Sequence, residues 1–289
     1  MKRREMLLST GAALLGMSAF PSGFLAGAEK KKRKILYFTR CAGFVHPVVA
    51  RKGTAPSFSD KVWTEMCAKH DVEVVCTKDG RVFDGDLDQF DAITFYTSGD
   101  LTQGGDDPAT PPMSKEGKAR LLRAVADGKG FLAFHAANDS FHSTGGKISD
   151  FIAMLGGEFV THGRQQEATM RVVSPEFPGA KGLGRSFKMM EEWYALNNFA
   201  RDLHVILVQE TEGMVDECYQ RPPFPATWAR VQGKGRVFYT SMGHREDVWT
   251  SAAFQQIVLG GLSWVLKNVD ADVTPNIQQV TPKADQMKR

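Results

Sequence analysis

The amino-acid sequence predicts an α/β fold built around a mostly parallel central sheet with helices on both faces. Two observations predict it. Short apolar runs alternate with helical patterns through the first half of the chain, in the order strand, helix, strand, strand, helix, strand. The runs are continuously apolar rather than alternating, which is typical of parallel strands that are buried on both faces.

Four strands and two helices are predicted in this first half. A helix over residues 57–69 has apolar side chains near helical spacing. A second helix over residues 114–127 can be capped by Ser114, and Gly128 ends it. The strands are expected at residues 34–39, 72–76, 92–96 and 130–134.

The second half of the chain is less regular. A short helix is expected at residues 147–155, and a strongly apolar helix at residues 252–266. The domain is therefore predicted to span residues 34–268, and the polar segment 269–289, which contains two prolines, is expected to form a flexible tail. Strands are expected at residues 167–173, 204–209, 227–231 and 236–240, the last two pairing across a glycine-containing turn.

The N-terminus is predicted to be a secretory signal peptide over residues 1–28. A basic start, Lys2-Arg3-Arg4, precedes a mostly apolar stretch, and Ala26-Gly27-Ala28 offers a small-residue cleavage site. The arginine pair resembles a twin-arginine export signal, and an ordinary Sec signal is the alternative. The apolar stretch is too short and interrupted for stable membrane insertion. We therefore expect an exported bacterial protein, in the periplasm or beyond.

Basic residues are concentrated near the N-terminus. The chain has 36 Lys and Arg against 33 Asp and Glu, a net charge of +3. Residues 1–34 carry a net charge of +6, including a basic spacer at residues 29–33, so the remainder carries −3. A nucleic-acid partner is not expected, because such surfaces need basic side chains clustered on the folded domain.

Several common motifs are missing from the sequence. It has no phosphate-binding G-x-x-x-x-G-K-[ST] loop and no G-x-G-x-x-G after the first strand, so no nucleotide cofactor is expected. It also lacks the H-E-x-x-H motif of zinc proteases and the G-x-S-x-G motif of serine hydrolases.

Histidines gather where predicted strands end. The carboxyl ends of parallel strands meet at one edge of a sheet, where ligands bind. Neutral imidazole can transfer protons near pH 7 or bind a metal, and the carboxylates Asp139 and Glu192 can orient the rings or join the coordination. Five of the seven histidines fall at this edge: His46, His135, His142, His162 and His244.

Five segments carry a resemblance to a known family. They are G-F-V-H at 43–46, H-A-A-N-D-S-F-H at 135–142, G-G-E-F-V-T-H at 156–162, E-E-W-Y at 191–194 and G-K-G-R-V-F-Y-T-S-M-G-H at 233–244. On these segments the chain resembles the ThuA-like family, named for trehalose utilisation, over about residues 34–266. The resemblance implies a flavodoxin-like three-layer sandwich, similar to class I glutamine amidotransferases. Those enzymes have a nucleophilic cysteine at the turn where this chain has His135, so thiol-based glutamine hydrolysis is not expected.

The resemblance also implies a function in carbohydrate use. The family is linked to sugar dehydrogenases that make 3-keto-glycosides, so a glycoside or 3-keto-glycoside is the expected substrate and such dehydrogenases are expected functional partners. A ketone acidifies the neighbouring C–H bond, so a general base can start enolisation, epimerisation or elimination. A divalent metal such as zinc can polarise the ketone.

We predict roles for the residues at this edge on that basis. The roles are catalysis for His135, His162, Asp139 and Tyr194, substrate binding for His46, Trp193, His244 and Arg245, and metal binding for His135, His162 and Glu192.

Two other functions stay open. A non-catalytic carbohydrate-binding protein would need only the polar and aromatic groups at the same edge. Metal-dependent hydrolysis of an ordinary glycoside would need two carboxylates about 5–10 Å apart. Glu191 and Glu192 are expected to point to opposite sides of a strand, so hydrolysis ranks below keto-sugar chemistry.

Overall fold

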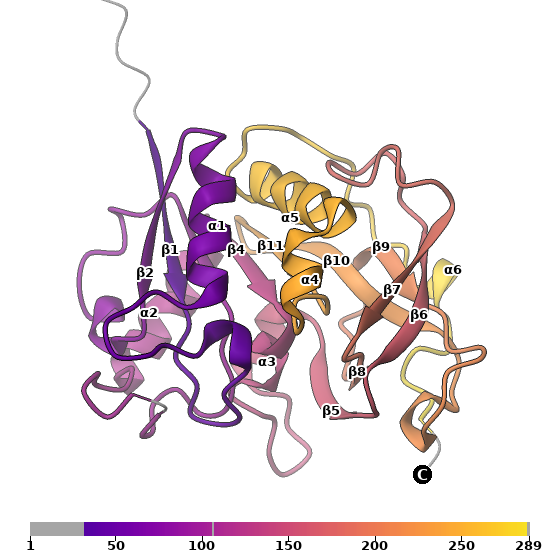
Figure 1. Ribbon diagram of the computed structural model, residues 1–289, viewed down its shortest axis with the longest axis horizontal. Coiled ribbons are helices and arrows are strands. Elements are labelled where there is room, and N and C mark those ends of the chain that lie inside the picture. Colours follow the sequence, from indigo (N-terminus) through magenta and orange to yellow (C-terminus); the bar gives the residue numbers. More distant parts are fainter. Residues whose placement is uncertain (1–31, 106, 288–289) are drawn as a thin grey trace, which may run out of the picture. The chain divides into compact units, whose positions relative to one another are not determined.

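A nine-stranded sheet runs through the part of the chain that the computed structural model describes, residues 32–105 and 107–287 (Figure 1). Five of its strands pair in parallel, in the order β2-β1-β3-β4-β11, which is the flavodoxin-like order with β11 as the fifth strand. These strands are β1 (Arg33–Phe38), β2 (Val72–Thr77), β3 (Ala92–Phe95), β4 (Gly130–Phe134) and β11 (Gly235–Thr240).

The other half of the sheet is antiparallel. It continues from β11 through β10 (Phe224–Gln232), β9 (His204–Gln209), β6 (Gln166–Val172) and β7 (Ser186–Glu191). The predicted parallel sheet is therefore confirmed for the first half of the chain, and the predicted pairing before and after the glycine turn forms the β10–β11 hairpin. The edge strand β7 has only two buried residues and no continuous apolar run, so the sequence gives no strand signal there.

A separate two-stranded sheet pairs β5 (Glu158–His162) with β8 (Tyr194–Asn197). Neither segment is among the predicted strands, and both are short. These strands position His162 and Tyr194, the residues at which they pair.

Helices cover both faces of the large sheet, as predicted. On one face α1 (Phe58–Ala68) contacts α4 (Glu246–Thr250) and α5 (Ala252–Val265), and on the other α2 (Lys115–Ala126) contacts α3 (Asp150–Leu155) (Figure 1). Each of the four longer helices begins at a serine whose side chain accepts a backbone N–H bond of the first turn. The capping serines are Ser57, Ser114, Ser149 and Ser251.

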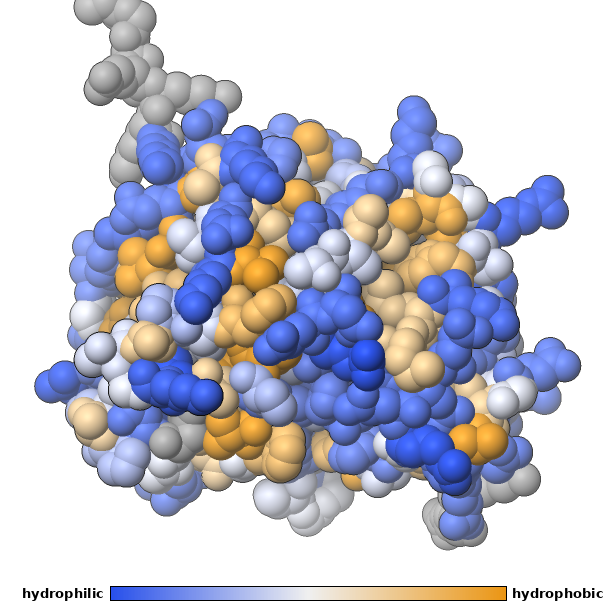
Figure 2. Space-filling model, viewed as in Figure 1, coloured by the Kyte–Doolittle hydropathy of each residue, from blue (hydrophilic) through white to orange (hydrophobic). Residues whose placement is uncertain are grey.

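The core lies between these layers and holds the strand ends in place. Every residue of β3 and β4 is buried, and so are the last four residues of β1 and β11. Hydrophilic side chains and smaller apolar areas share the face seen in Figure 2. A 3-10 helix, η3 (His135–Asp139), follows β4 directly and is buried through its first four residues. Shorter 3-10 helices lie at Pro47–Val49, Gly80–Phe83 and Glu217–Tyr219.

The C-terminal segment is packed rather than flexible, which corrects the expectation for residues 269–289 as far as residue 287. It contains a short helix, α6 (Ile277–Val280). Just before it, Asn276 Oδ1 accepts a hydrogen bond from the Val205 N–H at 2.7 Å, and its Nδ2 donates to the Val205 carbonyl at 3.0 Å. Asp285 accepts a bond from the Phe199 N–H. These side chains attach a polar segment to the start of β9 and to the loop before it, a contact that composition does not indicate.

The predicted signal peptide, residues 1–28, lies outside the described residues. Of the predicted spacer, Arg33 is already the first residue of β1, where its guanidinium contacts the Asp91 carboxylate at 2.7 Å. Within residues 32–105 and 107–287, no helix has the length and apolar character needed to cross a membrane.

The attachment of the C-terminal segment can be tested with Asn276→Ala. The substitution leaves the Val205 N–H without its side-chain acceptor and removes one of the two side-chain donors to the Val205 carbonyl, which keeps Ser174 Oγ. Because the N–H then has no side-chain partner, we expect the free energy of unfolding to fall by about 1–3 kcal/mol. Urea unfolding followed by circular dichroism measures it. Gln279→Ala, at an exposed position of α6, is the matched control. Equal stability of the two variants would contradict the attachment.

Candidate functional site

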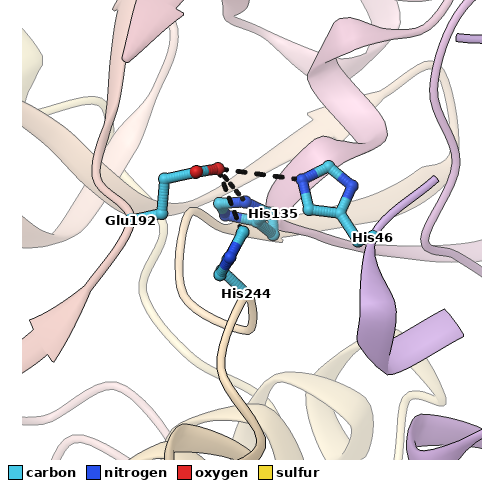
Figure 3. Close-up of side chains that lie close together, drawn as sticks. All are labelled: His46, His135, Glu192 and His244. Atoms are coloured by element: carbon cyan, nitrogen blue, oxygen red, sulfur yellow. Dashed lines mark ion pairs between the residues drawn. The ribbon is translucent and has the colours of Figure 1, made fainter. Parts of the chain in front are cut away.

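Three histidines and one glutamate converge at the carboxyl edge of the sheet. One ligand atom from each of His46, His135, Glu192 and His244 lies within 4.8 Å of the others (Figure 3). The Glu192 Oε2 atom is 3.0 Å from His244 Nδ1, 3.5 Å from His135 Nε2 and 3.8 Å from His46 Nε2. The three rings therefore surround a single carboxylate oxygen.

The three imidazoles follow three strands of the parallel half of the sheet; β4 and β11 are neighbours, and β3 lies between β1 and β4. His46 follows β1, His135 follows β4 at once, and His244 follows β11. The loop that carries His46 is held close to the loop after β3, because Gly43 packs against Gly99. A Cβ atom on Gly99 would lie 2.4 Å from the Gly43 nitrogen, and Gly99 also has a φ of +75°. Glycine at 99 thus permits the approach that brings His46 to the edge.

His135 is fixed in both its ring and its backbone. Its Nδ1 lies 2.8 Å from the Ser241 carbonyl oxygen, and since that oxygen only accepts, Nδ1 carries the ring proton. The His135 carbonyl accepts a bond from the Tyr239 hydroxyl. Its φ of +36° is unusual for a residue with a side chain and costs about 1–3 kcal/mol. This turn aims the unprotonated Nε2 into the cluster.

Glu191 connects the backbone segments that carry Glu192 and His244. Its buried carboxylate accepts backbone N–H bonds from Glu192 at 2.9 Å, Gly243 at 2.8 Å and His244 at 3.1 Å. Burial raises the pKa of Glu191 to about 8, although the three N–H donors favour the ionised carboxylate. Glu191 and Glu192 both reach His244, so the expectation that they point to opposite sides is wrong. Glu191 is the last residue of β7, so the side-chain alternation of a strand does not extend to Glu192.

The electrostatics of the cluster are those of neutral rings around an anion. Burial lowers the pKa of His135 to about 3 and also lowers that of His46. Burial disfavours the ionised form of Glu192, but the imidazoles around it, of which His244 Nδ1 at 3.0 Å is the nearest, hold its pKa well below the usual range. At neutral pH the Glu192 carboxylate is therefore ionised while His135 and His46 are uncharged.

These residues fit a divalent transition metal. His135 Nε2 is buried without a hydrogen-bond partner, and its lone pair faces an ionised carboxylate 3.5 Å away. Two electron-rich atoms at that distance are stabilised by a cation between them. Imidazole nitrogen and carboxylate oxygen are the ligands that zinc takes, at distances that place tetrahedral ligands about 3.3 Å apart. The spacings around Glu192 Oε2 are close to that value.

His162 and Tyr194 form a second layer beside this cluster. His162 Nδ1 lies 3.0 Å from the Gly163 carbonyl oxygen and 3.5 Å from the other oxygen of Glu192. The Tyr194 ring packs on the His135 ring with centroids 4.1 Å apart, and its hydroxyl lies 3.1 Å from His46 Nε2. His162 is exposed, whereas Tyr194 is buried.

Two clefts open beside the cluster, one lined by His162 and one by His244. The His162 cleft has a volume of about 650 Å³ and includes Arg164 and Asp216 in its wall. The His244 cleft has a volume of about 420 Å³ and is lined by Gln165 and Arg245, among others. Both volumes are in the range of small-molecule sites.

Asp139 belongs to a different network. His142 lies between two carboxylates, with Nε2 2.6 Å from Asp139 Oδ1 and Nδ1 3.0 Å from Glu158 Oε1. Asn198 donates to the other oxygen of Glu158. Contact with Asp139 raises the pKa of His142, because a charged imidazolium can donate to both carboxylates. This network joins the end of η3 to the start of β5.

Comparison with known proteins identifies the family. The family model described as "ThuA: Trehalose utilisation" matches residues 34–265, which is most of the chain. The chain belongs to the ThuA family. Among solved structures it is similar to ThuA-like proteins from Bacteroides uniformis ATCC 8492 and Parabacteroides merdae ATCC 43184. The first has 18% identity and a TM-score of 0.62, with 85% of this chain and 95% of that chain covered. The second has 17% identity and a TM-score of 0.61, with coverages of 84% and 92%.

A cytoplasmic protein from Salmonella typhimurium is a third structural neighbour of this ThuA family member. It has 13% identity and a TM-score of 0.51, and the match covers 80% of this chain and 98% of that one. At these identities the neighbours show the fold alone. No protein in the curated set matches the sequence.

The structure places the predicted site residues of this ThuA family member in three groups. Two of the three predicted metal ligands, His135 and Glu192, lie in the cluster, joined there by His46 and His244, which were predicted to bind substrate. His162 and Tyr194 lie beside the cluster. Asp139 and Arg245 bond elsewhere, to His142 and to Asp247 and Gln165.

Trp193 corrects one prediction. Its ring is fully buried and its indole N–H donates to the Gln166 carbonyl at 3.0 Å, so no ring face is available to stack on a sugar. Sequence reasoning also missed Gln165, whose amide contacts His244, and the anchoring role of Glu191. Glu191 lies within the E-E-W-Y segment beside Glu192, which was predicted to bind a metal. Nothing in the sequence indicates that Glu191 instead binds backbone N–H groups.

The charge state of His142 can be tested by NMR titration. We expect its pKa above the ordinary 6.5, because both ring nitrogens face carboxylates. A raised pKa contributes stability that is present below pH 6.5 and is lost as pH rises through the folded-state value. Asp139→Asn should lower the pKa of His142 and remove part of this pH dependence, while Asp247→Asn, outside this network, should change neither. A His142 pKa at or below 6.5 in the unmodified protein would contradict the charged network.

Proposed function

We propose that this member of the ThuA family is a carbohydrate-processing enzyme that binds a divalent metal and acts on a 3-keto-glycoside by proton transfer. The observation that carries the proposal is the buried His135 Nε2 lone pair, aimed without a partner toward the ionised Glu192 carboxylate. Such an arrangement is unfavourable in an empty protein interior and favourable around a cation.

The residues that would hold the metal are His46, His135 and Glu192, with His244 as a candidate fourth ligand. We propose zinc as the ion, because its ligands are imidazole nitrogens and carboxylates. When bound, such an ion would polarise a ketone oxygen and stabilise negative charge on it. The Ser241 carbonyl accepts the hydrogen bond from His135 Nδ1–H and so fixes the tautomer of His135 in which Nε2 is unprotonated.

His162 is the proposed general base. The Gly163 carbonyl accepts from its Nδ1, so the basic lone pair of His162 is on Nε2. Its side chain is 46% exposed and lines the larger cleft, so substrate can reach it. We propose that Nε2 takes the proton from the carbon next to the ketone. The electron pair left on that carbon can then expel the glycosidic oxygen from the neighbouring carbon, and that oxygen takes up a proton.

The substrate class is proposed from the family description and from this chemistry. A family described by trehalose utilisation favours a glycoside. Glu191 is occupied by three backbone N–H groups, which makes it a poor partner for Glu192 in ordinary two-carboxylate hydrolysis. A keto-glycoside needs one base and one electrophile, and His162 and the cluster supply those roles. We also propose export to the periplasm of a bacterium and a functional link to a sugar dehydrogenase that makes the ketone.

The metal site is tested by the metal content of the purified chain from Glu29 onward. We expect about one equivalent of a divalent ion per chain. Glu192→Gln or His135→Ala should weaken binding by at least 100-fold, because each removes a ligand from a buried site. His70→Ala, at an exposed position just after α1 and outside the cluster, is the control. Failure to bind zinc, manganese, iron or cobalt after reconstitution would remove the metal from the proposal.

Catalysis is tested separately with a 3-keto-glycoside as substrate. His162→Ala should lower kcat by about 10²- to 10⁴-fold, the usual contribution of a general base, with metal content unchanged. His204→Ala, whose ring contacts the Thr274 carbonyl, is the control. A sugar-dependent rise in melting temperature with no product in the metal-loaded protein would instead support the non-catalytic binding function.

A further inference from the structure

A chain of polar side chains leads from the surface to His244. Asp247 holds the Arg245 guanidinium through two contacts of 2.9 Å. Arg245 Nη1 donates to Gln165 Oε1 at 2.8 Å, and Gln165 Nε2 lies 3.0 Å from His244 Nε2. Gln165 therefore lies between a guanidinium and an imidazole, with its oxygen on one and its nitrogen on the other.

The guanidinium decides which way the Gln165 amide faces. Arginine has donors and no acceptor, so the amide group that meets it must be the oxygen. The amide nitrogen, which is a donor, then faces His244 Nε2. A donor at 3.0 Å requires a lone pair on that ring nitrogen. The remaining nitrogen of a neutral His244, Nδ1, must therefore carry the proton.

We propose that Arg245 and Gln165 are positioning residues that hold His244 as the Nδ1–H tautomer, so that His244 presents a proton rather than a lone pair to the cluster. Its Nδ1 lies 3.0 Å from the Glu192 Oε2 atom, where a proton is favoured by the carboxylate charge. The inference rests on the proposed function for its consequence, since it assigns different roles to the four clustered residues. His46, His135 and Glu192 are the metal ligands, and His244 is a hydrogen-bond donor.

This assignment gives the site an electrophile of its own. His244 Nδ1 makes no aligned hydrogen bond within the part of the chain that is described, so its proton remains available to a substrate oxygen. A neutral imidazole that donates in this way can stabilise an enolate without first losing or gaining a proton. His244 also lines the smaller cleft, which gives a substrate access to its side of the cluster.

Glutamate at position 165 would reverse the arrangement. A carboxylate can accept from Arg245 and from His244 Nε2 at the same time, which frees a lone pair on Nδ1 for a metal. Carboxylate–histidine–metal arrangements of this kind strengthen binding. The native glutamine therefore disfavours His244 as a ligand, and Gln165→Glu should convert it into one.

The tautomer is measured by long-range ¹H–¹⁵N NMR of the metal-free full mature chain, which distinguishes protonated from unprotonated ring nitrogens. His244→Ala assigns the signal. We expect Nδ1–H in the unmodified protein and a shift toward Nε2–H in Gln165→Glu and in Arg245→Met. Arg164→Met is the matched control, because Arg164 lies on the same turn but contacts Asp216 instead. Nε2–H in the unmodified protein, or no response to either variant, would overturn the proposal.

Zinc affinity, measured by competition with a chelator, provides the second readout. Gln165→Glu should bind zinc about 10- to 100-fold more tightly than the unmodified protein, and Arg164→Met should bind it equally well. Unchanged affinity in a protein that does bind zinc would overturn the division of roles. Absence of zinc binding in every variant would contradict the proposed metal site, while the NMR result would still decide the tautomer.

Discussion

The buried carboxylate of Glu191 ties together two parts of the sheet that strand order keeps apart. Glu191 ends β7, the last strand of the antiparallel half, and Gly243 and His244 follow β11 in the middle of the sheet. Its bonds to their backbone N–H groups fix the loop that carries one histidine, and its bond to the next N–H fixes Glu192. A hydrogen bond contributes about 0.5–1.5 kcal/mol to stability, so three bonds to one buried group together hold this crossing.

That crossing places the Glu192 carboxylate among three imidazole rings, two of which are fully buried. The residues packed around the site must hold this arrangement. His135 has a left-handed backbone, a conformation that persists only where neighbours over-determine it. Here Ser241 accepts from its ring and Tyr239 donates to its carbonyl, both from the β11 side of the site. The buried strand β4 and the buried last four residues of β11 pair in parallel beneath them. Packing and hydrogen bonding thus maintain a turn that neither the local sequence nor the residue type favours.

Sequence patterns predict those parts of this molecule in which a run of one residue type occurs in only one kind of structure. Continuous apolar runs mark the parallel strands, and the carboxyl-edge rule brings His46, His135 and His244 to one place. The strands β5, β7 and β8 are short or half exposed and leave no such pattern. Trp193 shows the same limit, because the sequence does not distinguish an aromatic residue that lines a site from one that is buried below it. Its burial follows from tertiary packing alone.

The histidines at this edge acquire different properties from the partners that face them. His142 lies between two carboxylates, which favour a charged ring. His135 and His162 each contact a backbone carbonyl, which accepts only and therefore fixes the proton on Nδ1. His244 meets an amide whose direction is set by an arginine. The different roles that we propose for these identical imidazoles therefore follow from whether the neighbouring atom accepts or donates, and that is a property of contacts made across the fold rather than along the chain.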